Sequence, residues 1–395
     1  MNRLKYIFIF LILIACFQSK SQSIKVNELL PFVKIDKGEY TTALALLDEL
    51  IKENTKIEFF KAKIDVLINL EQYPEALLIC DQLDKINPEN SGRERIKIYQ
   101  QSGTYQELET EVVKNKKSRD KISLYDYLTN EDYTIAQDIA LKKNQYTLIE
   151  KQIYQTRLLV DNEKYSQALF IVEEILAQGT TDSEVFFLQS KIAYGLKDYK
   201  KSNYAIVKAI SLNPTQTAYY RQKALINLKI GNYNAALESA NKLIRKEEYV
   251  VDNYILKLEI LVADNQFEES SILSNILLEL IPENKKVLML NGKSLFKTGD
   301  YLGALKSTNH LLEIEKTKEA FELRGDVYMA TNTFQFAEYD YSMYLDIYPL
   351  NGDVYAKKGF ARYKQGNLKG ACSDWEKGIR YGSYNAIKYK EQYCK

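Results

Sequence analysis

The sequence predicts an all-α fold, a solenoid of stacked antiparallel helical hairpins, and three observations lead to it. An aromatic residue recurs at intervals that are mostly 32 to 34 residues long, and a small residue usually follows it by three positions. Only 6 prolines and 16 glycines occur among the 395 residues, a composition that favours helices. The recurring positions are Tyr40, Tyr73, Tyr105, Tyr133, Tyr165, Tyr199, Tyr233, Phe267, Tyr301, Phe334 and, in the eleventh place, Leu368.

Residues 183–216 illustrate how one repeat is expected to fold. Apolar residues at helical spacing, such as Phe186 and Ile192, lead to Lys197-Asp198-Tyr199, which interrupts the pattern. A second apolar stripe follows, and Pro214 ends it because proline cannot continue a helix. The same plan recurs in 24–56, 57–90, 149–182, 217–250, 251–284, 285–317, 318–351 and 352–385.

These residues closely resemble the tetratricopeptide repeat (TPR) family. Its pattern has a small residue at position 8, an aromatic at 17, alanine at 20 and proline at 32 of each repeat. Position 8 holds Ser190, Ala224, Gly292, Gly325 and Gly359, and position 32 holds Pro88, Pro214, Pro282 and Pro349. The resemblance implies a right-handed superhelical solenoid of about 11 TPR-like units plus a C-terminal capping helix.

The pattern divides the chain into five expected segments. Residues 1–21 (or 1–15 in a lipoprotein) form a signal peptide, and residues 22–90 form N-terminal TPR-like repeats. Residues 91–148 form degenerate repeats, where the period drops and lysines cluster. This segment is either a hinge or docking surface, or a degenerate unit with a solvated basic loop. A regular array follows in 149–385, and 386–395 form the capping helix.

The N-terminus is typical of an export signal. Arg3 and Lys5 precede an apolar run that is shorter than the ~20 residues needed to span a bilayer. Two processing routes fit: a lipobox that ends in Cys16, which would become lipid-modified, or general cleavage before Gln22. Both predict an exported protein, periplasmic or associated with the outer membrane, with membrane attachment only through the lipid.

The chain end contains two cysteines that are expected to pair. The segment 370–375 and the helix after it resemble a closing unit of exported Bacteroidota repeat proteins. Cys372 lies nine residues before Tyr381 and Cys394 eleven after Ser383, so an antiparallel helix pair places both sulfurs at a similar height. A disulfide would add about 3 kcal/mol. The alternative is two small buried hydrophobic residues that never bond.

Catalytic chemistry is absent from the sequence. There is no P-loop, no dinucleotide fingerprint and no nucleophile elbow, and the single histidine, His310, has no metal-binding companions. We therefore expect no enzyme activity, no catalytic residue, no cofactor and no metal. The 54 basic and 53 acidic residues balance, which argues against a nucleic-acid partner.

The family resemblance implies a concave groove lined by the first helix of each hairpin. It predicts a protein or peptide partner, bound by a non-enzymatic scaffold of the bacterial envelope. The alternative is a structural or anchoring subunit of an envelope secretion or assembly complex, acting through the convex face or the ends. The partner's identity and the oligomeric state stay open. The candidate groove residues are Arg157, Phe187, Lys191, Tyr194, Arg221, Lys293, Phe296, Phe360 and Tyr363.

Overall fold

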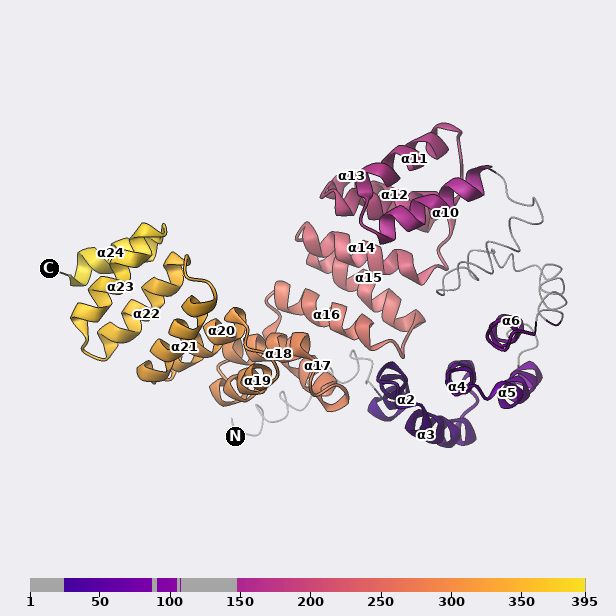
Figure 1. The fold of residues 1–395 in the computed structure, drawn as a ribbon, viewed down its shortest axis with the longest axis horizontal. Coiled ribbons are helices and arrows are strands. Elements are labelled where there is room, and N and C mark those ends of the chain that lie inside the picture. Colours follow the sequence, from indigo (N-terminus) through magenta and orange to yellow (C-terminus); the bar gives the residue numbers. More distant parts are fainter. Residues whose placement is uncertain (1–24, 87–90, 105–106, 108–147, 395) are drawn as a thin grey trace, which may run out of the picture. The chain divides into compact units, whose positions relative to one another are not determined.

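The computed structural model describes residues 25–86, 91–104, 107 and 148–394. Every regular element within these ranges is an α-helix, which confirms the all-α prediction (Figure 1). By its contacts the chain divides into two compact units, residues 1–121 and 122–395. The signal segment with Cys16, and most of the degenerate segment 91–148, lie outside the described residues. No described helix is both long and apolar enough to cross a membrane.

The described part of the first unit contains two complete hairpins and one further helix. Its buried core is formed by residues such as Phe60, Ile64, Ala76 and Cys80. Cys80 is fully buried in this core. The elements are α2 (Val26–Asp36), α3 (Tyr40–Glu53), α4 (Ile57–Asn69), α5 (Tyr73–Ile86) and α6 (Gly92–Gln101).

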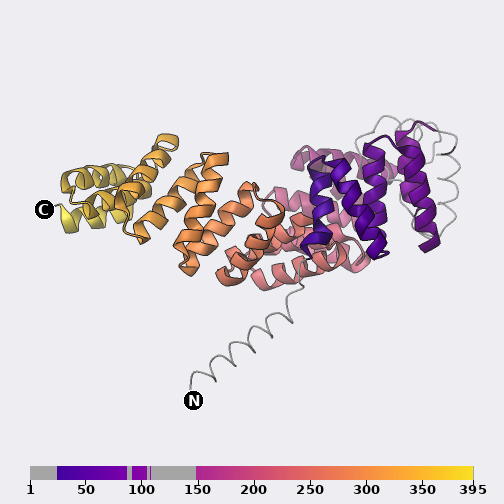
Figure 2. The same cartoon turned by 90° about the horizontal axis from the view of Figure 1, so that it is seen from below.

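The described part of the second unit contains seven hairpins followed by a single helix. Figures 1 and 2 show how these helices follow one another. The first helices are α10 (Leu148–Asp161), α12 (Ser183–Gly195), α14 (Thr217–Lys229), α16 (Val251–Ala263), α18 (Lys285–Thr298), α20 (Lys318–Ala330) and α22 (Gly352–Lys364). The second helices are α11 (Tyr165–Ala177), α13 (Tyr199–Leu212), α15 (Tyr233–Lys246), α17 (Phe267–Leu280), α19 (Tyr301–Ile314), α21 (Phe334–Ile347) and α23 (Leu368–Arg380). The final helix is α24 (Tyr384–Tyr393).

The turn inside each hairpin explains why position 15 is glycine or polar. This residue ends the first helix in the left-handed conformation, with φ +76° at Gly231 and +64° at Lys197. A polar side chain at position 16 then often caps the second helix. For example, Asp198 accepts a hydrogen bond from the Lys201 backbone N–H at 3.0 Å.

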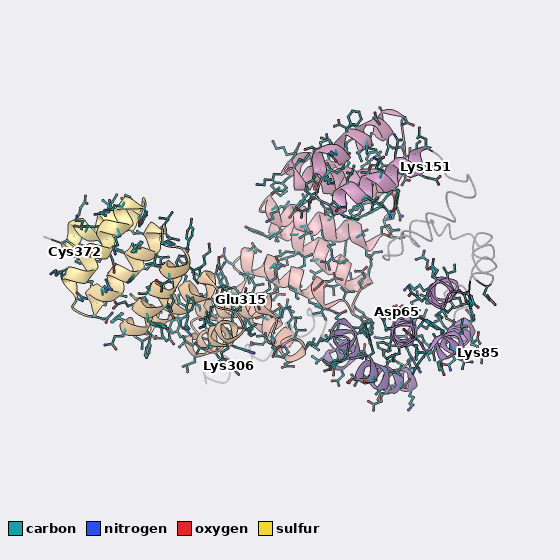
Figure 3. The ribbon with its side chains drawn as sticks, viewed as in Figure 1. Asp65, Lys85, Lys151, Lys306, Glu315 and Cys372 are labelled. Atoms are coloured by element: carbon teal, nitrogen blue, oxygen red, sulfur yellow. A yellow bond between two sulfur atoms is a disulfide. The ribbon has the colours of Figure 1, made fainter. Side chains whose placement is uncertain are left out.

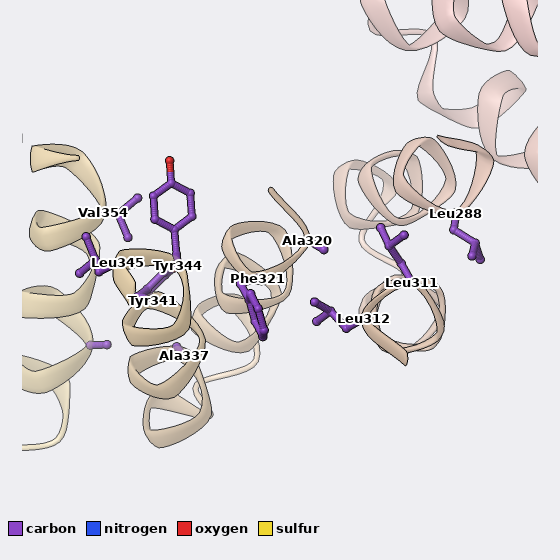
Figure 4. Packing of buried hydrophobic residues seen from close by; sticks show 11 residues of the cluster. Leu288, Leu311, Leu312, Ala320, Phe321, Ala337, Tyr341, Tyr344, Leu345 and Val354 are labelled. Carbon is purple, nitrogen blue, oxygen red and sulfur yellow. The ribbon is translucent and has the colours of Figure 1, made fainter. Parts of the chain in front are cut away.

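Small and large residues fit together inside each hairpin. A Cβ at Gly325 would stand 2.7 Å from the Tyr341 ring, and one at Gly359 would stand 2.6 Å from Trp375. Tyr341 and Trp375 are almost completely buried. Position 8 must therefore be small where position 24 is a large aromatic residue. Figure 4 shows Tyr341 within the core that runs from Leu288 on α18 to Val354 on α22.

Neighbouring repeats are closest along their first helices. In the series α10, α12, α14, α16, α18 and α20, each first helix contacts the next one. Among the described residues, no two successive second helices make comparable contact. The second unit therefore curves toward its first helices. We call the surface made by positions 5, 9, 12 and 13 of α10, α12, α14, α16, α18, α20 and α22 the first-helix face.

The capping helix α24 begins at Tyr384. The reason is Ser383, whose hydroxyl accepts a hydrogen bond from the Ala386 N–H at 3.3 Å. α24 packs on both α22 and α23. Cys372 and Cys394 lie with their sulfurs 1.95 Å apart and their Cα atoms 5.9 Å apart, which permits the expected bond. Figure 3 labels Cys372 near the end of the array.

Candidate partner-binding face

Three of the predicted groove cations contact the neighbouring repeat. Arg157 Nε on α10 lies 3.0 Å from Glu184 Oε1 on α12, and Lys191 Nζ on α12 lies 3.5 Å from Asp161 Oδ1 on α10. Arg221 Nη2 on α14 donates a hydrogen bond to Asn253 Oδ1 on α16 at 2.5 Å. These side chains hold successive first helices together, a role that the sequence did not indicate.

The Arg157–Glu184 pair lies partly out of solvent. Burial raises the pKa of Glu184, and the positive charge of Arg157 acts against that rise. Next to this pair, burial also raises the pKa of Tyr219 to about 12, although its hydrogen bond to Ser183 opposes the shift. The Tyr219 hydroxyl lies 3.1 Å from Ser183 Oγ. This part of the face is a packed seam between repeats.

Aromatic rings from the predicted set cover α12. The ring of Phe187 packs against Tyr219 of α14, with centroids 4.8 Å apart. Lys191 Nζ lies 5.9 Å from the Phe187 ring centroid, close enough for a weak cation–π contact. Tyr194 contacts Tyr199 edge-on at 5.6 Å. Phe187 and Tyr194 stay half-buried, so each still presents part of its ring to solvent.

The surface of α18 is the most accessible part of the predicted set. Lys293 is exposed and has no ion-pair partner among the described residues. Phe296, one turn further along, is half-buried with its ring 6.1 Å from that of Tyr301. Lys297 Nζ lies 5.7 Å from the centroid of the Phe296 ring. An aromatic ring flanked by two lysines is therefore available here.

The acidic residues of α20 are neutralised from the next repeat. Lys357 Nζ on α22 lies 2.7 Å from Glu322 Oε1 and 2.8 Å from Asp326 Oδ2. The Tyr341 hydroxyl donates a hydrogen bond to Asp326 Oδ1 at 2.8 Å. The sequence did not single out Lys357, which stands at position 6 of its repeat.

The last two predicted groove residues lie against the capping helix. The Phe360 ring stacks on Tyr389 of α24 at 5.1 Å, and Tyr363 contacts Tyr393 at 4.3 Å. Both belong to the cluster built around the fully buried Trp375. Sequence position alone assigned them to the face, but α24 occupies the place of a next first helix and packs on both rings.

One pocket lies on the opposite side, between the second helices α19 and α21. It measures about 280 Å³ and is lined by Asn309, Leu312, Glu313, Lys316, Phe321, Arg324, Tyr339 and Met343. Arg324 is held there by two hydrogen bonds to the fully buried Asp340, at 2.8 and 2.6 Å, and by one to Asn309 at 2.8 Å. Burial raises the pKa of Asp340, while Arg324 opposes the rise. No sequence signal marked this pocket.

The side chains of the described surface also bear on metal binding. Within the described residues, no three histidine, cysteine, aspartate or glutamate side chains gather in a way that could hold a metal ion. The buried charged groups named above each contact a neighbouring repeat or helix. The fold and this face define a helical-repeat solenoid of the tetratricopeptide type.

Comparisons with known proteins support the TPR family. No family model matches the chain. The TPR repeat-containing protein MJ1428 of Methanocaldococcus jannaschii is 27% identical over 253 residues, which are 58% of this chain and 43% of that protein. The chain thus spans less than half of this relative. Proteins of this family generally mediate protein–protein interactions and are typically non-catalytic.

Two solved structures are similar to this chain. The APC/C hetero-tetramer Cut9-Hcn1 is similar over 93% of this chain and 89% of its own, with a TM-score of 0.50 and 10% identity. A tetratricopeptide repeat protein from Parabacteroides merdae is similar over 60% of this chain and 95% of its own, with a TM-score of 0.49 and 14% identity. The first likeness is one of fold alone.

Proposed function

We propose that this protein is a non-enzymatic scaffold of the bacterial cell envelope that binds a protein or peptide on its first-helix face. The observation that carries the proposal is the exposed Lys293 beside the half-buried Phe296 on α18. Interfaces gain most of their energy from a few aromatic and cationic anchors of this kind. Both residues belong to the first-helix face, which supports the proposal.

An exposed residue is the better position at which to test partner binding, because it can be changed without breaking contacts between neighbouring repeats. Reversing the charge of Lys191 or Arg221 would also break contacts between repeats, so lost binding would have two explanations. A photo-crosslinking amino acid in place of Lys293 avoids this difficulty. The matched control carries the same amino acid in place of Lys306, which is exposed on the second helix α19 (labelled in Figure 3).

Crosslinking in living cells separates the two candidate functions. A protein that is captured from position 293 and not from position 306 supports binding on the first-helix face. The alternative function, an anchoring subunit that acts through the outer face, is favoured by the pocket beside Arg324 and by the exposed Phe336 and Tyr339. Capture from position 306 alone would replace the first proposal with this alternative.

The envelope location is part of the proposal and rests on the N-terminal sequence. Cell fractionation and the intact mass of the mature protein test it together. A mature chain that begins at Gln22 indicates a periplasmic or secreted protein, and a lipid-modified Cys16 indicates an anchored one. Retention of Arg3 and Lys5 in the purified native protein would contradict export.

A further inference from the structure

The first-helix face carries more positive than negative charge, although the chain as a whole is balanced. The whole sequence has 54 basic and 53 acidic residues. Positions 5, 9, 12 and 13 of the seven first helices in the second unit hold seven cations and four anions. The cations are Arg157, Lys191, Arg221, Lys229, Lys293, Lys297 and Lys364, and the anions are Asp161, Glu259, Glu322 and Asp326.

Every one of these four anions already has a lysine partner from an adjacent repeat. Glu259 Oε1 lies 2.5 Å from Lys286 Nζ, and Asp161 Oδ1 lies 3.5 Å from Lys191 Nζ. Glu322 and Asp326 share Lys357. The negative charge on this face is therefore used to join repeats, and little remains to attract a partner.

Five of the cations have no carboxylate partner among the described residues, and one of these, Arg221, donates instead to the amide oxygen of Asn253. The other four have neither kind of partner there. They are Lys229 on α14, Lys293 and Lys297 on α18, and Lys364 at the end of α22. Lys297 and Lys364 lie 5.7 and 5.3 Å from the ring centroids of Phe296 and Phe360. These free positive charges alternate with apolar side chains that are partly exposed, among them Leu228 and Met289.

We infer that the partner segment is acidic, with apolar side chains placed between its carboxylates. Opposite charges favour encounter and set the register of a bound peptide, while the apolar side chains contribute burial. Neighbouring first helices lie about 8–10 Å apart, so α14 and α18 are separated by roughly 16–20 Å. An extended chain advances about 3.3 Å per residue and spans that distance in about six residues.

This inference rests on the proposed function, and its test uses random 12-residue peptides displayed on phage, selected against the whole mature chain at low salt. We expect enrichment of aspartate and glutamate together with leucine or aromatic residues. The double variant Lys293→Glu/Lys297→Glu should weaken binding of a selected acidic peptide about five- to tenfold per reversal, because attraction becomes repulsion. Added salt should reduce the difference.

The control is Lys306→Glu, a reversal on α19 that should leave the affinity unchanged. Circular dichroism verifies that both variants keep their helices. A selected pool without acidic enrichment, or an acidic peptide that binds the double variant as tightly as the unaltered protein, would overturn the inference. Crosslinking from position 293 distinguishes the two failures: if it persists, the face binds a partner of other chemistry, and if it is lost, the proposed function fails as well.

Discussion

Gly359 on α22 lies directly against the indole of Trp375 on α23. A Cβ at this glycine would stand 2.6 Å from Trp375 Nε1, and the indole N–H donates a hydrogen bond to the Ala356 carbonyl at 3.1 Å. The absence of one carbon atom therefore permits both the packing of the last hairpin and the hydrogen bond of its largest buried residue.

Gly359→Ala should destabilise the last repeat by about 1–3 kcal/mol, because the added methyl group overpacks the contact. Trp375 is the single tryptophan of the chain, so its fluorescence during urea unfolding reports on this region. Gly292→Ala is the control, because it adds the same methyl group at a less crowded position. Its Cβ would meet Thr308 Cγ2 at 3.1 Å, which predicts a smaller loss. Equal losses in the two variants would contradict the packing argument.

Arg324→Met should cost about 3–5 kcal/mol at neutral pH, because it leaves the carboxylate of Asp340 buried without its partner. The double variant Arg324→Met/Asp340→Leu should recover most of this loss, since no buried charge remains. Urea unfolding followed by circular dichroism measures both. If the single and double variants have the same free energy of unfolding, the loss of stability does not come from the unpaired carboxylate of Asp340.

Asp374→Asn should flatten the pH dependence of stability in acid. Burial raises the pKa of Asp374, against the opposing charges of Lys358 and Arg362. Arg362 Nη1 lies 2.9 Å from Asp374 Oδ2, but that oxygen accepts no hydrogen bond. A raised folded-state pKa means that the folded protein binds the proton more tightly, so stability falls as pH rises from about 4 through the folded-state value. Urea midpoints between pH 4 and 7 test this, and an unchanged slope in Asp374→Asn would contradict it.

Non-reduced mature protein without Cys16 should show one reactive thiol after unfolding, that of Cys80. Three thiols would show that Cys372 and Cys394 do not pair. In the folded protein Cys80 should resist thiol reagents near pH 8, because burial raises its pKa to about 12. Cys372→Ala/Cys394→Ala should lower stability by about 3 kcal/mol, from the lost constraint on the unfolded chain.

Lys197→Gly should stabilise its hairpin by up to about 1 kcal/mol. Lys197 has φ +64°, a conformation that costs an L-residue with a Cβ atom energy and that glycine adopts freely. The thermal midpoint of the variant should therefore rise. Lys208→Gly, at an exposed position inside the following helix α13, is the control and should lower the midpoint, because glycine is unfavourable in a helix interior.

The repeat architecture could be predicted from the sequence because each rule behind it is local. Helical periodicity, the aromatic interval and the turn at position 15 act within about 34 residues, and they recur often enough to be recognised. The small residues at position 8 were predicted for the same reason.

The candidate site was less predictable because it depends on contacts between repeats. Arg157, Lys191 and Arg221 look like free groove cations in sequence, yet each has a partner about 30 residues away. The outer pocket combines three helices and has no local signature. Which cations of the first-helix face lack a partner can be seen only once the ion pairs between repeats are known.

The sequence by itself determined the helices, their pairing into hairpins and the absence of a recognisable catalytic motif, because these follow from short-range patterns. The tertiary structure decided which charges remain available. In it, the carboxylates of the first-helix face form ion pairs with lysines of neighbouring repeats, whereas Lys293 and Lys297 on α18 are exposed. It also placed Phe360 and Tyr363 against α24. Helix formation depends on residues within a few turns of one another. Whether a charged side chain has an ion-pair partner depends on the residues of the next repeat that lie beside it.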